Sequence, residues 1–419
     1  MRRRAASVKP APPRLPPVST DAARPSRASV ALLALGALAY GWLLFAWFSL
    51  PAYLTVVADD LALSGTEAGV LAGAVPLTYV PVGLFSGALT DRVGGERAVG
   101  GGVTLVGAAH LTRSGAPDFP TMLLATLLLG VGGTGITFGL PKLVADRFPE
   151  RLVGRASAGY LVGSTVGTAA AFGLGRPTLG PALGGWRPFF AATGAAVLAF
   201  AAVWWAALIV AERTAPTPDR SDSESSLSAL RAVARTPAVG LLVAVGFVYL
   251  FVVHGLQGWL TAVLEARGAA PALAAHVTTL LVVAQLAGTV TLAPLAERLE
   301  RRRAAVPIAG ATLALGTAGV AVATDPLVAA ALVAGVGLGL GTVAPLIRAL
   351  PVKLDGVGAE RTGTAVGLVF AVGEIGGFTG PALVGALRDA TGSFVPGLGV
   401  LATAGLVAVA AGIGLVRQK

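Results

Sequence analysis

The chain of 419 residues contains no cysteine, so it can form neither a disulfide framework nor a thiolate metal site. Charged residues are also scarce. They make up 12% of the chain, against about 25% in soluble domains. Hydrophobic residues reach 55%. The composition therefore excludes an ordinary soluble domain and predicts a membrane protein.

The sequence also lacks the residue patterns of the common kinds of catalysis. It has no Ser-His-Asp arrangement outside the apolar segments, no spacing typical of metal ligands and no phosphate-binding loop. A glycine cluster at 130–135 superficially resembles a dinucleotide fingerprint, but it lies inside an apolar segment with no strand before it. We therefore expect no enzyme, no primary pump, no metal and no cofactor.

What the sequence has instead is a series of twelve apolar segments, each near the roughly 20 residues that cross a bilayer as a helix. The longest polar break, residues 212–236, is rich in serine and divides the chain into halves. The predicted fold is all-α, with twelve transmembrane helices in two six-helix bundles at 29–211 and 237–416. The expected segments are 29–53, 67–89, 97–114, 119–141, 155–178, 188–211, 237–262, 274–296, 304–323, 326–348, 361–386 and 394–416.

Residues 1–28 are rich in proline, arginine and alanine and show no apolar periodicity. This composition predicts a disordered basic tail. We expect no cleaved signal peptide, because the apolar run that follows is too long for one. An organellar transit peptide stays open as an alternative.

The distribution of positive charge predicts the orientation. If the N-terminus lies in the cytoplasm, 26 of the 31 Lys and Arg residues fall on the cytoplasmic side. Such a bias is what the positive-inside rule predicts for twelve spans with both termini inside. The net charge of +10 then reflects loops beside anionic lipid and not a nucleic-acid surface. The five exceptions, expected in outer loops, are Arg113, Arg176, Arg187, Arg267 and Arg388.

The two halves repeat each other. The stretch 87–92 has a counterpart at 294–298, the Gly-Val-Gly at 130–132 recurs at 335–337, and the Gly-Pro-Ala-Leu at 180–183 recurs at 380–383. With six helices in each half, both repeats start on the same side. The repeat is therefore expected to be parallel, about an axis along the membrane normal.

Residues 87–97 read GALTDRVGGER. Gly87, Asp91, Arg92 and Gly94 resemble the signature between helices 2 and 3 of the major facilitator superfamily, and Glu96 stands where a basic residue is usual. Gly87 would allow close helix approach, and Gly94 a tight turn. The resemblance implies that this motif latches the cytoplasmic side when the transporter is open outward. The alternative is a generic charged turn. A degenerate copy contains Glu297 and Arg298.

Gly180 and Pro181, with the Gly-Gly-Trp-Arg that follows at 184–187, resemble the helix-5 signature of the family's antiporters. Arg176 replaces an earlier glycine of that signature. The arginine that proton-coupled members carry in helix 4 is also missing, and Thr126 stands at its expected position.

The same small residues have a purely structural interpretation, in which they allow helices to pack closely and to kink. We expect this role in particular for Gly130, Gly132, Gly376, Gly380 and Pro381, alongside Gly180 and Pro181.

Three stretches are similar to the cyanate/nitroimidazole and nitrate/nitrite branches of the family: 140–149, 154–159 and 185–187. The nitrate branch implies cavity arginines in helices 2 and 8. This chain has Thr78, Tyr79 and Gln285 in those helices, so nitrate itself is disfavoured as a substrate.

Glu374 lies near the middle of the segment 361–386. A charge at the bilayer midplane costs about 2.5–3.5 kcal/mol on insertion scales, so intramembrane carboxylates usually mark functional sites. Glu374 is the predicted proton-coupling residue, and a structural hydrogen bond between helices is the alternative. His254 in segment 237–262 titrates near neutrality. It could pair with Glu374 or with a substrate anion, or it could only pack. His276 is expected at the outer end of its helix.

Other polar or aromatic residues lie at middle depth in helices that line the family's cavities. Each alone is more often a packing residue or an interfacial aromatic; together they could line a substrate site. These residues are Tyr40, Trp47, Tyr79, Tyr160, Ser164, Tyr249, Gln257 and Gln285. Lys142 and Arg348 lie at inner helix ends, where long side chains extend toward water.

Together these features predict a secondary transporter of the plasma membrane that works by alternating access. We expect a monomer in the lipid bilayer that moves a small organic or inorganic anion, coupled to protons. A proton-coupled exporter of drugs or metabolites and a membrane receptor or scaffold without transport are the alternatives. No nucleic-acid partner is expected.

Overall fold

The computed structural model describes residues 25–212, 227–354 and 357–417, and in this part of the chain every regular element is helical. Twelve helices have at least twenty residues. They are α1 (Arg27–Ala52), α3 (Gly65–Val93), α4 (Gly95–Ser114), α5 (Phe119–Arg147), α6 (Glu150–Ala170), α8 (Trp186–Glu212), α10 (Pro237–Ala266), α11 (Pro271–Arg298), α12 (Arg302–Val322), α13 (Pro326–Ala349), α14 (Gly358–Thr391) and α15 (Val395–Arg417). The short elements are α2 (Leu54–Asp60), the π-helix η1 (Ala171–Leu179), α7 (Gly180–Leu183), α9 (Leu227–Ala234) and the 3₁₀-helix η2 (Pro351–Lys353).

The all-α membrane fold is confirmed, but the number of spans is not. Among the described residues, nine helices are long and apolar enough to cross a membrane, and α3 becomes a tenth when its two bent parts count as one span. α4 and α6 fall outside this set. Both are rich in glycine, threonine and serine, which lowers their hydropathy. Twelve spans therefore remain a prediction.

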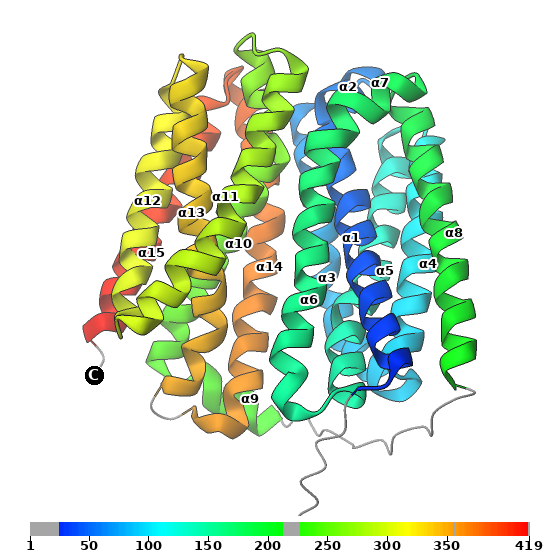
Figure 1. Ribbon diagram of the computed structural model, residues 1–419. Helices are drawn as coiled ribbons and strands as arrows, with labels where there is room; N and C mark the ends of the chain where they lie inside the picture. The colour runs from blue at the N-terminus through cyan, green and yellow to red at the C-terminus, as the bar shows by residue number, and fades with distance from the viewer. Residues whose placement is uncertain (1–24, 213–226, 355–356, 418–419) are drawn as a thin grey trace, which may run out of the picture.

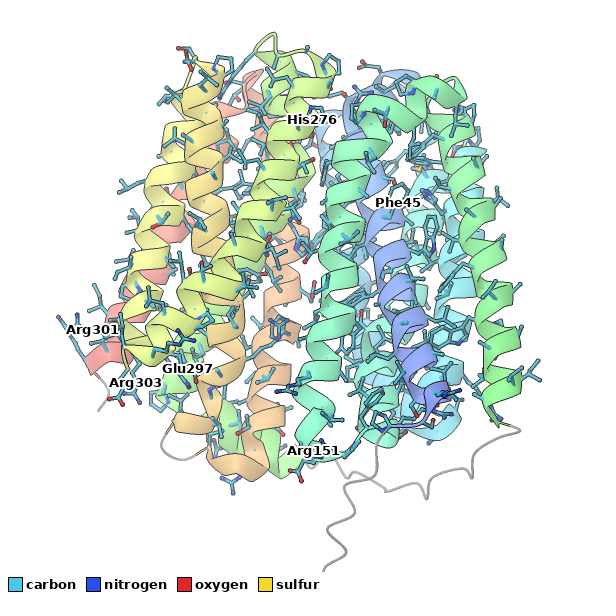
Figure 2. All side chains as sticks on the ribbon, viewed as in Figure 1. Phe45, Arg151, His276, Glu297, Arg301 and Arg303 are labelled. Carbon is cyan, nitrogen blue, oxygen red and sulfur yellow. The ribbon has the colours of Figure 1, made fainter. Side chains whose placement is uncertain are left out.

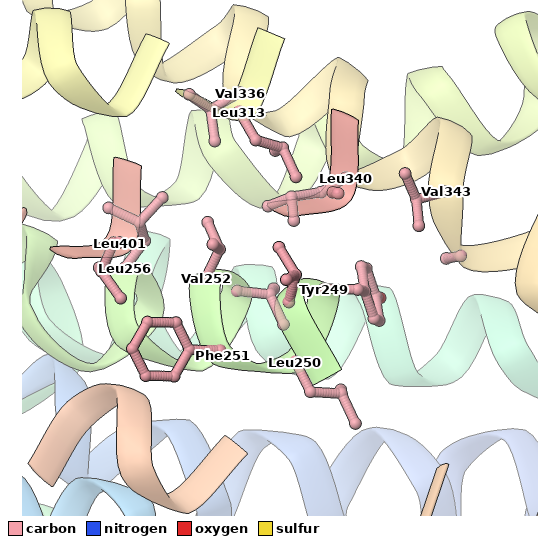
Figure 3. Close-up of a cluster of buried hydrophobic side chains, with 14 of the residues drawn as sticks. Tyr249, Leu250, Phe251, Val252, Leu256, Leu313, Val336, Leu340, Val343 and Leu401 are labelled. Carbon is pink, nitrogen blue, oxygen red and sulfur yellow. The ribbon is translucent and has the colours of Figure 1, made fainter. Parts of the chain in front are cut away.

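The buried side chains form two clusters. One contains only residues from α1 to α8. The other is built from α9 to α15 and includes Leu54, Ala68 and Ala72 of the first half. Figure 1 shows the corresponding groups of helices side by side. Figure 3 shows part of the second cluster, where Val252 of α10 lies on the side facing Leu340 of α13 and Leu250 points the other way. We call these groups the N half and the C half.

The two halves meet mainly where α3 packs on α14 and where η1 and α6 pack on α11, and α1 also contacts α10. In Figure 1, α2 and α7 lie at one end of the molecule, which we call the α2 end, and α9 lies at the opposite end, which we call the α9 end. In lipid, every backbone polar group must be satisfied inside the protein. At the α2 end, α3 meets this need with a capping box, in which Ser64 and Glu67 bond to each other's backbone N–H groups.

The sequence-based boundaries need two corrections. The segment expected at 155–178 is α6 followed by the π-helix η1, which contains Pro177. Proline has no N–H to donate and disturbs the regular ladder, and π-helices are frequent at functional sites. The polar linker expected at 212–236 contains α9, which packs on α10 and α14 through the buried Val233. The predicted disordered tail lies largely outside the described residues.

Candidate functional site

Glu374 lies in the middle of α14 and is half-buried. Its Oε2 atom is buried and has no hydrogen-bond partner. The carboxyl group lies within electrostatic range of the phenols of Tyr40, Tyr79 and Tyr249. An unpartnered carboxylate in apolar surroundings is costly. The unpartnered oxygen of Glu374 can therefore accept a proton or a hydrogen bond from water or a ligand group.

His254 of α10 lies across the interface between the halves. Its ring stacks on Trp47 of α1, with centroids 5.4 Å apart, and on Phe48 at 6.4 Å. Among the described residues, no hydrogen bond joins His254 to Glu374. The buried Nδ1 of His254 has no partner, and neither does the buried Nε1 of Trp47. The pairing with Glu374, one of the alternatives for His254, is therefore not formed in this conformation, in which the imidazole stacks on Trp47.

The tyrosines of the predicted cavity make contacts within their own halves. Tyr40 packs against Tyr160 with ring centroids 6.0 Å apart. Tyr79 shares a hydrogen bond of 2.9 Å with Thr137. In the C half, Gln285 Nε2 donates to the hydroxyl of Tyr249 at 3.0 Å. Trp47 and Tyr79 connect the aromatic stack to this group, with a centroid distance of 6.1 Å.

The remaining predicted polar residues are less central. Gln257 is buried in α10, three positions beyond His254. The Ser164 hydroxyl donates to the Leu161 carbonyl of its own helix at 2.7 Å, so it is committed to α6. His276 is exposed near the α2 end of α11, as Figure 2 shows.

Arg348 lies in the last turn of α13 and is exposed, in agreement with the expected position at a helix end. Its guanidinium lies 4.5 Å from the centroid of Phe370 on α14. It is within electrostatic range of Tyr40, Tyr160 and Tyr249. α13 ends beside α14, so the Phe370 ring is within reach of the guanidinium and forms a cation–π contact with it. Lys142, by contrast, pairs with Asp146 one turn along α5 at 3.1 Å.

The expected placement of Arg113 needs a correction. It was placed in an outer loop, yet its side chain is fully buried at the end of α4. Nε donates to Thr126 at 3.1 Å, Nη1 donates to the Ala46 carbonyl at 2.9 Å, and Nη2 has no partner. The guanidinium thus contacts Thr126 of α5, the fourth long helix, and Thr126 stands at the position of the helix-4 arginine of proton-coupled members. The sequence could not predict this burial, because an arginine next to the end of an apolar segment is normally expected to face water.

Glycines show where the halves touch. At the α2 end, a Cβ on Gly69 would lie 2.5 Å from the Pro381 carbonyl oxygen, and one on Gly377 would lie 3.0 Å from Pro76 and His254. Toward the α9 end, added Cβ atoms would meet nothing within 4 Å at Gly87 of α3, or at Gly363 and Gly367 of α14. The contacts that these glycines allow between the halves therefore lie on the part of α3 and α14 toward the α2 end, and the glycines toward the α9 end make no such contact.

The predicted gating motif lies toward the α9 end. Asp91 and Arg92 are exposed, and Gly94 adopts φ of +91° in the turn between α3 and α4. The close helix approach expected at Gly87 is absent from this conformation, since an added Cβ would meet nothing within 4 Å. In the degenerate copy, Glu297 pairs with Arg302 within the C half and Arg298 is exposed. Figure 2 shows Glu297 near this end of the molecule.

The glycines predicted for helix packing do lie at close helix contacts. A Cβ on Gly130 would lie 2.7 Å from Thr78 Oγ1, and one on Gly132 would lie 2.8 Å from the Gly102 carbonyl oxygen. The hydroxyl of Tyr53 packs directly against Gly180. In α14, Gly376 and Gly380 lie against the backbone of α10, and the Pro381 carbonyl accepts a hydrogen bond of 2.8 Å from Trp259.

The described residues contain no cluster of three or more His, Asp or Glu side chains that could hold a metal ion. What the site offers is a cation, a carboxyl group and an aromatic stack between two helical halves. The sequence model of the Major Facilitator Superfamily matches residues 33–381. The chain belongs to this superfamily. It is a multi-pass membrane transporter and not an enzyme.

The relatives support the transporter assignment. The 3-(3-hydroxy-phenyl)propionate transporter of Escherichia coli is 30% identical to this transporter over 78% of this chain and 79% of its own length. The uncharacterized transporter YycB of Bacillus subtilis is 25% identical over 87% and 88% of the two chains. The quinolone resistance protein NorA of Staphylococcus aureus is 27% identical over 36% of this chain and 37% of its own length. These relatives do not support the cyanate or nitrate branch.

The fold has the same architecture as a solved relative. A bacterial homologue of the human lysosomal transporter Spinster, in an inward-facing and unoccupied conformation, gives a TM-score of 0.74. It is 19% identical to this transporter, and the match covers 93% of this chain and 95% of the other. At this identity the likeness concerns the fold alone.

Proposed function

We propose that this transporter carries a small organic anion, coupled to protons, by alternating access of one central site to the two sides of the plasma membrane. The proposal places the N-terminus and the α9 end in the cytoplasm, as the distribution of Lys and Arg predicts. In that orientation the conformation described here is open to the cytoplasm and closed to the outside.

The position of Arg348 carries the anion assignment. Among the described residues, no carboxylate forms an ion pair with its guanidinium, which instead lies over Phe370. It donates one hydrogen bond, from Nη1 to the Ala344 carbonyl at 3.0 Å. A guanidinium has five N–H donors in a fork that matches a carboxylate. Most of its donors are therefore available to an anionic ligand that enters from the α9 end.

The order of groups along α14 suggests an elongated ligand. Phe370, whose ring contacts the guanidinium of Arg348, lies four residues before Glu374. Gly377, which lies next to the ring of His254, follows Glu374 by three residues. At 1.5 Å per residue the distance from Phe370 to Gly377 is about 10 Å along the helix axis. A ligand with a carboxylate at Arg348 and an aromatic ring at the Trp47–His254 stack would span this distance, and arylpropanoates have a comparable length.

This arrangement gives a physical route for proton coupling. A carboxylate bound at Arg348 would lie about one helical turn from Glu374. Two negative charges at that separation repel each other, and protonation of Glu374 removes the repulsion. Proton and anion would therefore bind cooperatively, each raising the affinity for the other.

The relative in Escherichia coli supports the choice of an aromatic carboxylate, since its name gives 3-(3-hydroxyphenyl)propionate as the transported molecule. The NorA similarity and the partial antiporter signature favour a second candidate, a proton-coupled drug exporter. The exposed cation of Arg348 disfavours the lipophilic cations that such an exporter would carry.

Flux measurements in proteoliposomes test the proposal. Purified protein is reconstituted with an imposed pH gradient, and uptake of 3-(3-hydroxyphenyl)propionate, benzoate, propionate and a lipophilic cation is compared. We expect accumulation of the aromatic carboxylates only when the gradient is present. Gradient-driven movement of the cation with none of the carboxylates would establish the exporter instead. Absence of any flux, with intact thermal stabilisation by a ligand, would favour a receptor.

A further inference from the structure

Glu265, near the end of α10, connects the C half to the N half at the α2 end. Its Oε1 accepts a hydrogen bond from Arg176 Nη2 at 2.9 Å, and its Oε2 accepts one from Thr55 Oγ1 at 2.7 Å. The side chains of Arg176 and Glu265 are only 12% and 14% exposed. Both carboxylate oxygens of Glu265 in the C half thus accept hydrogen bonds from donors in the N half.

Arg176 is held in place for this contact. It lies in η1, where its guanidinium is 5.0 Å from the ring centroid of Tyr53. The Tyr53 hydroxyl donates to the Gly175 carbonyl at 3.0 Å. Cation–π contact and the hydroxyl anchor fix the arginine on the wide turns of the π-helix. Arg176, which replaces a glycine of the antiporter signature, therefore serves here to bind Glu265 of the other half.

A second cross-connection lies at the same end. Asp389 of α14 accepts hydrogen bonds from the backbone N–H groups of Gly65 and Thr66, both at 2.7 Å, and from Thr66 Oγ1 at 2.6 Å. These N–H groups belong to the first turn of α3, where a negative charge is also favoured by the helix dipole. A Cβ on Gly65 would lie 2.6 Å from the Asp389 carboxylate, so the glycine allows the close approach.

We propose that these two contacts form a latch between the halves. In the latch, Glu265 binds Arg176 and Thr55, and Asp389 binds Gly65 and Thr66. The latch must open in every transport cycle, and its strength sets how often the α2 end opens. The proposal rests on alternating access and not on the identity of the substrate. Opening at this end would separate α3 from α14 and α10 from both η1 and α2, which breaks all five hydrogen bonds. At the α9 end, glycines of the same helices α3 and α14 face open space, so the latch opposes opening at one end only.

The absence of cysteine allows a direct test. Cysteines introduced at the exposed positions Ala182 of α7 and Ala272 of α11 place one spin label on each half at the α2 end. Pulsed electron paramagnetic resonance then measures the distance distribution without substrate. We expect one short distance in the parent protein. Glu265→Gln and Asp389→Asn should each raise the population of longer distances about tenfold, and the double variant should raise it further.

Asp60→Asn is the matched control. Asp60 pairs with Arg187 at 2.9 Å at the same end, but both residues belong to the N half. This variant should leave the distance distribution unchanged. Thermal unfolding of each variant checks the fold, and the charge swap Arg176→Glu with Glu265→Arg should restore the short distance. Unchanged distances in both latch variants, or an equal shift in Asp60→Asn, would overturn the proposal. Because no substrate is present, loss of anion transport would leave this result intact.

Discussion

The imidazole of His254 lies face to face with the indole of Trp47, with the ring planes inclined by 6° and the centroids 5.4 Å apart. The two residues are 207 positions apart in the sequence and belong to different halves. The stack therefore exists only while the halves are close at this depth. It places two unpartnered ring N atoms, Nδ1 of His254 and Nε1 of Trp47, near the centre of the molecule.

Replacing Trp47 with leucine should weaken binding of aromatic carboxylates and spare aliphatic ones. Aromatic pairs contribute about 0.5–1.5 kcal/mol beyond the area they bury, so we expect the dissociation constant of 3-phenylpropionate to rise roughly two- to tenfold. Binding can be followed by isothermal titration of detergent-purified protein. Propionate is the internal control. An equal loss for both ligands would show that Trp47 acts on the fold and not on the ring.

Removing the charge of Arg348 should cost more. Hydrogen bonds to charged groups contribute about 1.5–3 kcal/mol, so Arg348→Gln should raise the KM for carboxylates at least about tenfold. Arg348→Lys keeps the charge but loses the planar fork of donors, so its KM for carboxylates should lie between those of the parent and of Arg348→Gln. Uptake kinetics in proteoliposomes give the values. If glutamine and lysine variants both match the parent, the anion binds elsewhere.

Glu374→Gln tests proton coupling at one atom. The amide keeps the size of the side chain but cannot take up a proton. We expect gradient-driven accumulation to be lost while exchange of labelled for unlabelled substrate continues. In the parent, lowering the pH should tighten anion binding, since a proton on Glu374 removes a repelling charge. The glutamine variant should bind with pH-independent affinity. Persistent accumulation in this variant would move the coupling role to another group.

Arg113 gives a prediction about stability. The guanidinium is fully buried, and its hydrogen bonds in the described part of the chain go to the Thr126 hydroxyl and the Ala46 carbonyl, neither of them charged. Arg113→Ala should lower the free energy of unfolding by about 1–3 kcal/mol, because a cavity forms and the hydroxyl of Thr126 loses a donor. Arg113→Met fills the volume without a buried charge and should cost less, or nothing. Thermal unfolding in detergent compares the two. A methionine variant that is less stable than the alanine variant would contradict this account.

Gly69 and Gly87 lie on the same helix and form a matched pair. A Cβ on Gly69 would lie 2.5 Å from the Pro381 carbonyl, whereas one on Gly87 would meet nothing within 4 Å. Gly69→Ala should therefore lower the melting temperature or force the α2 end apart, as cross-linking across that end would show. Gly87→Ala should leave stability unchanged. If the motif at Gly87 closes the α9 end in another state, the same variant should slow transport.

The sequence by itself determined the class of this protein and much of its internal layout. Scarce charge and long apolar segments lead to a helical membrane protein, because lipid allows only internally hydrogen-bonded backbones to cross. The matched stretches at 130–132 and 335–337 indicate two related halves. Glu374 could be identified from its isolation alone, since a carboxylate in an apolar segment is costly wherever it lies.

Only the tertiary structure decided which residues meet and which end is closed. Arg348 and Arg113 both lie near helix ends in the sequence, yet one lies over Phe370 and the other is buried against Ala46. Hydropathy along a single helix cannot show this, because the partners come from other helices. The same holds for Glu265 and Arg176, whose contact joins the two halves. Such contacts depend on the relative position of two rigid bundles, and that position differs between the states of a transporter while the sequence stays the same.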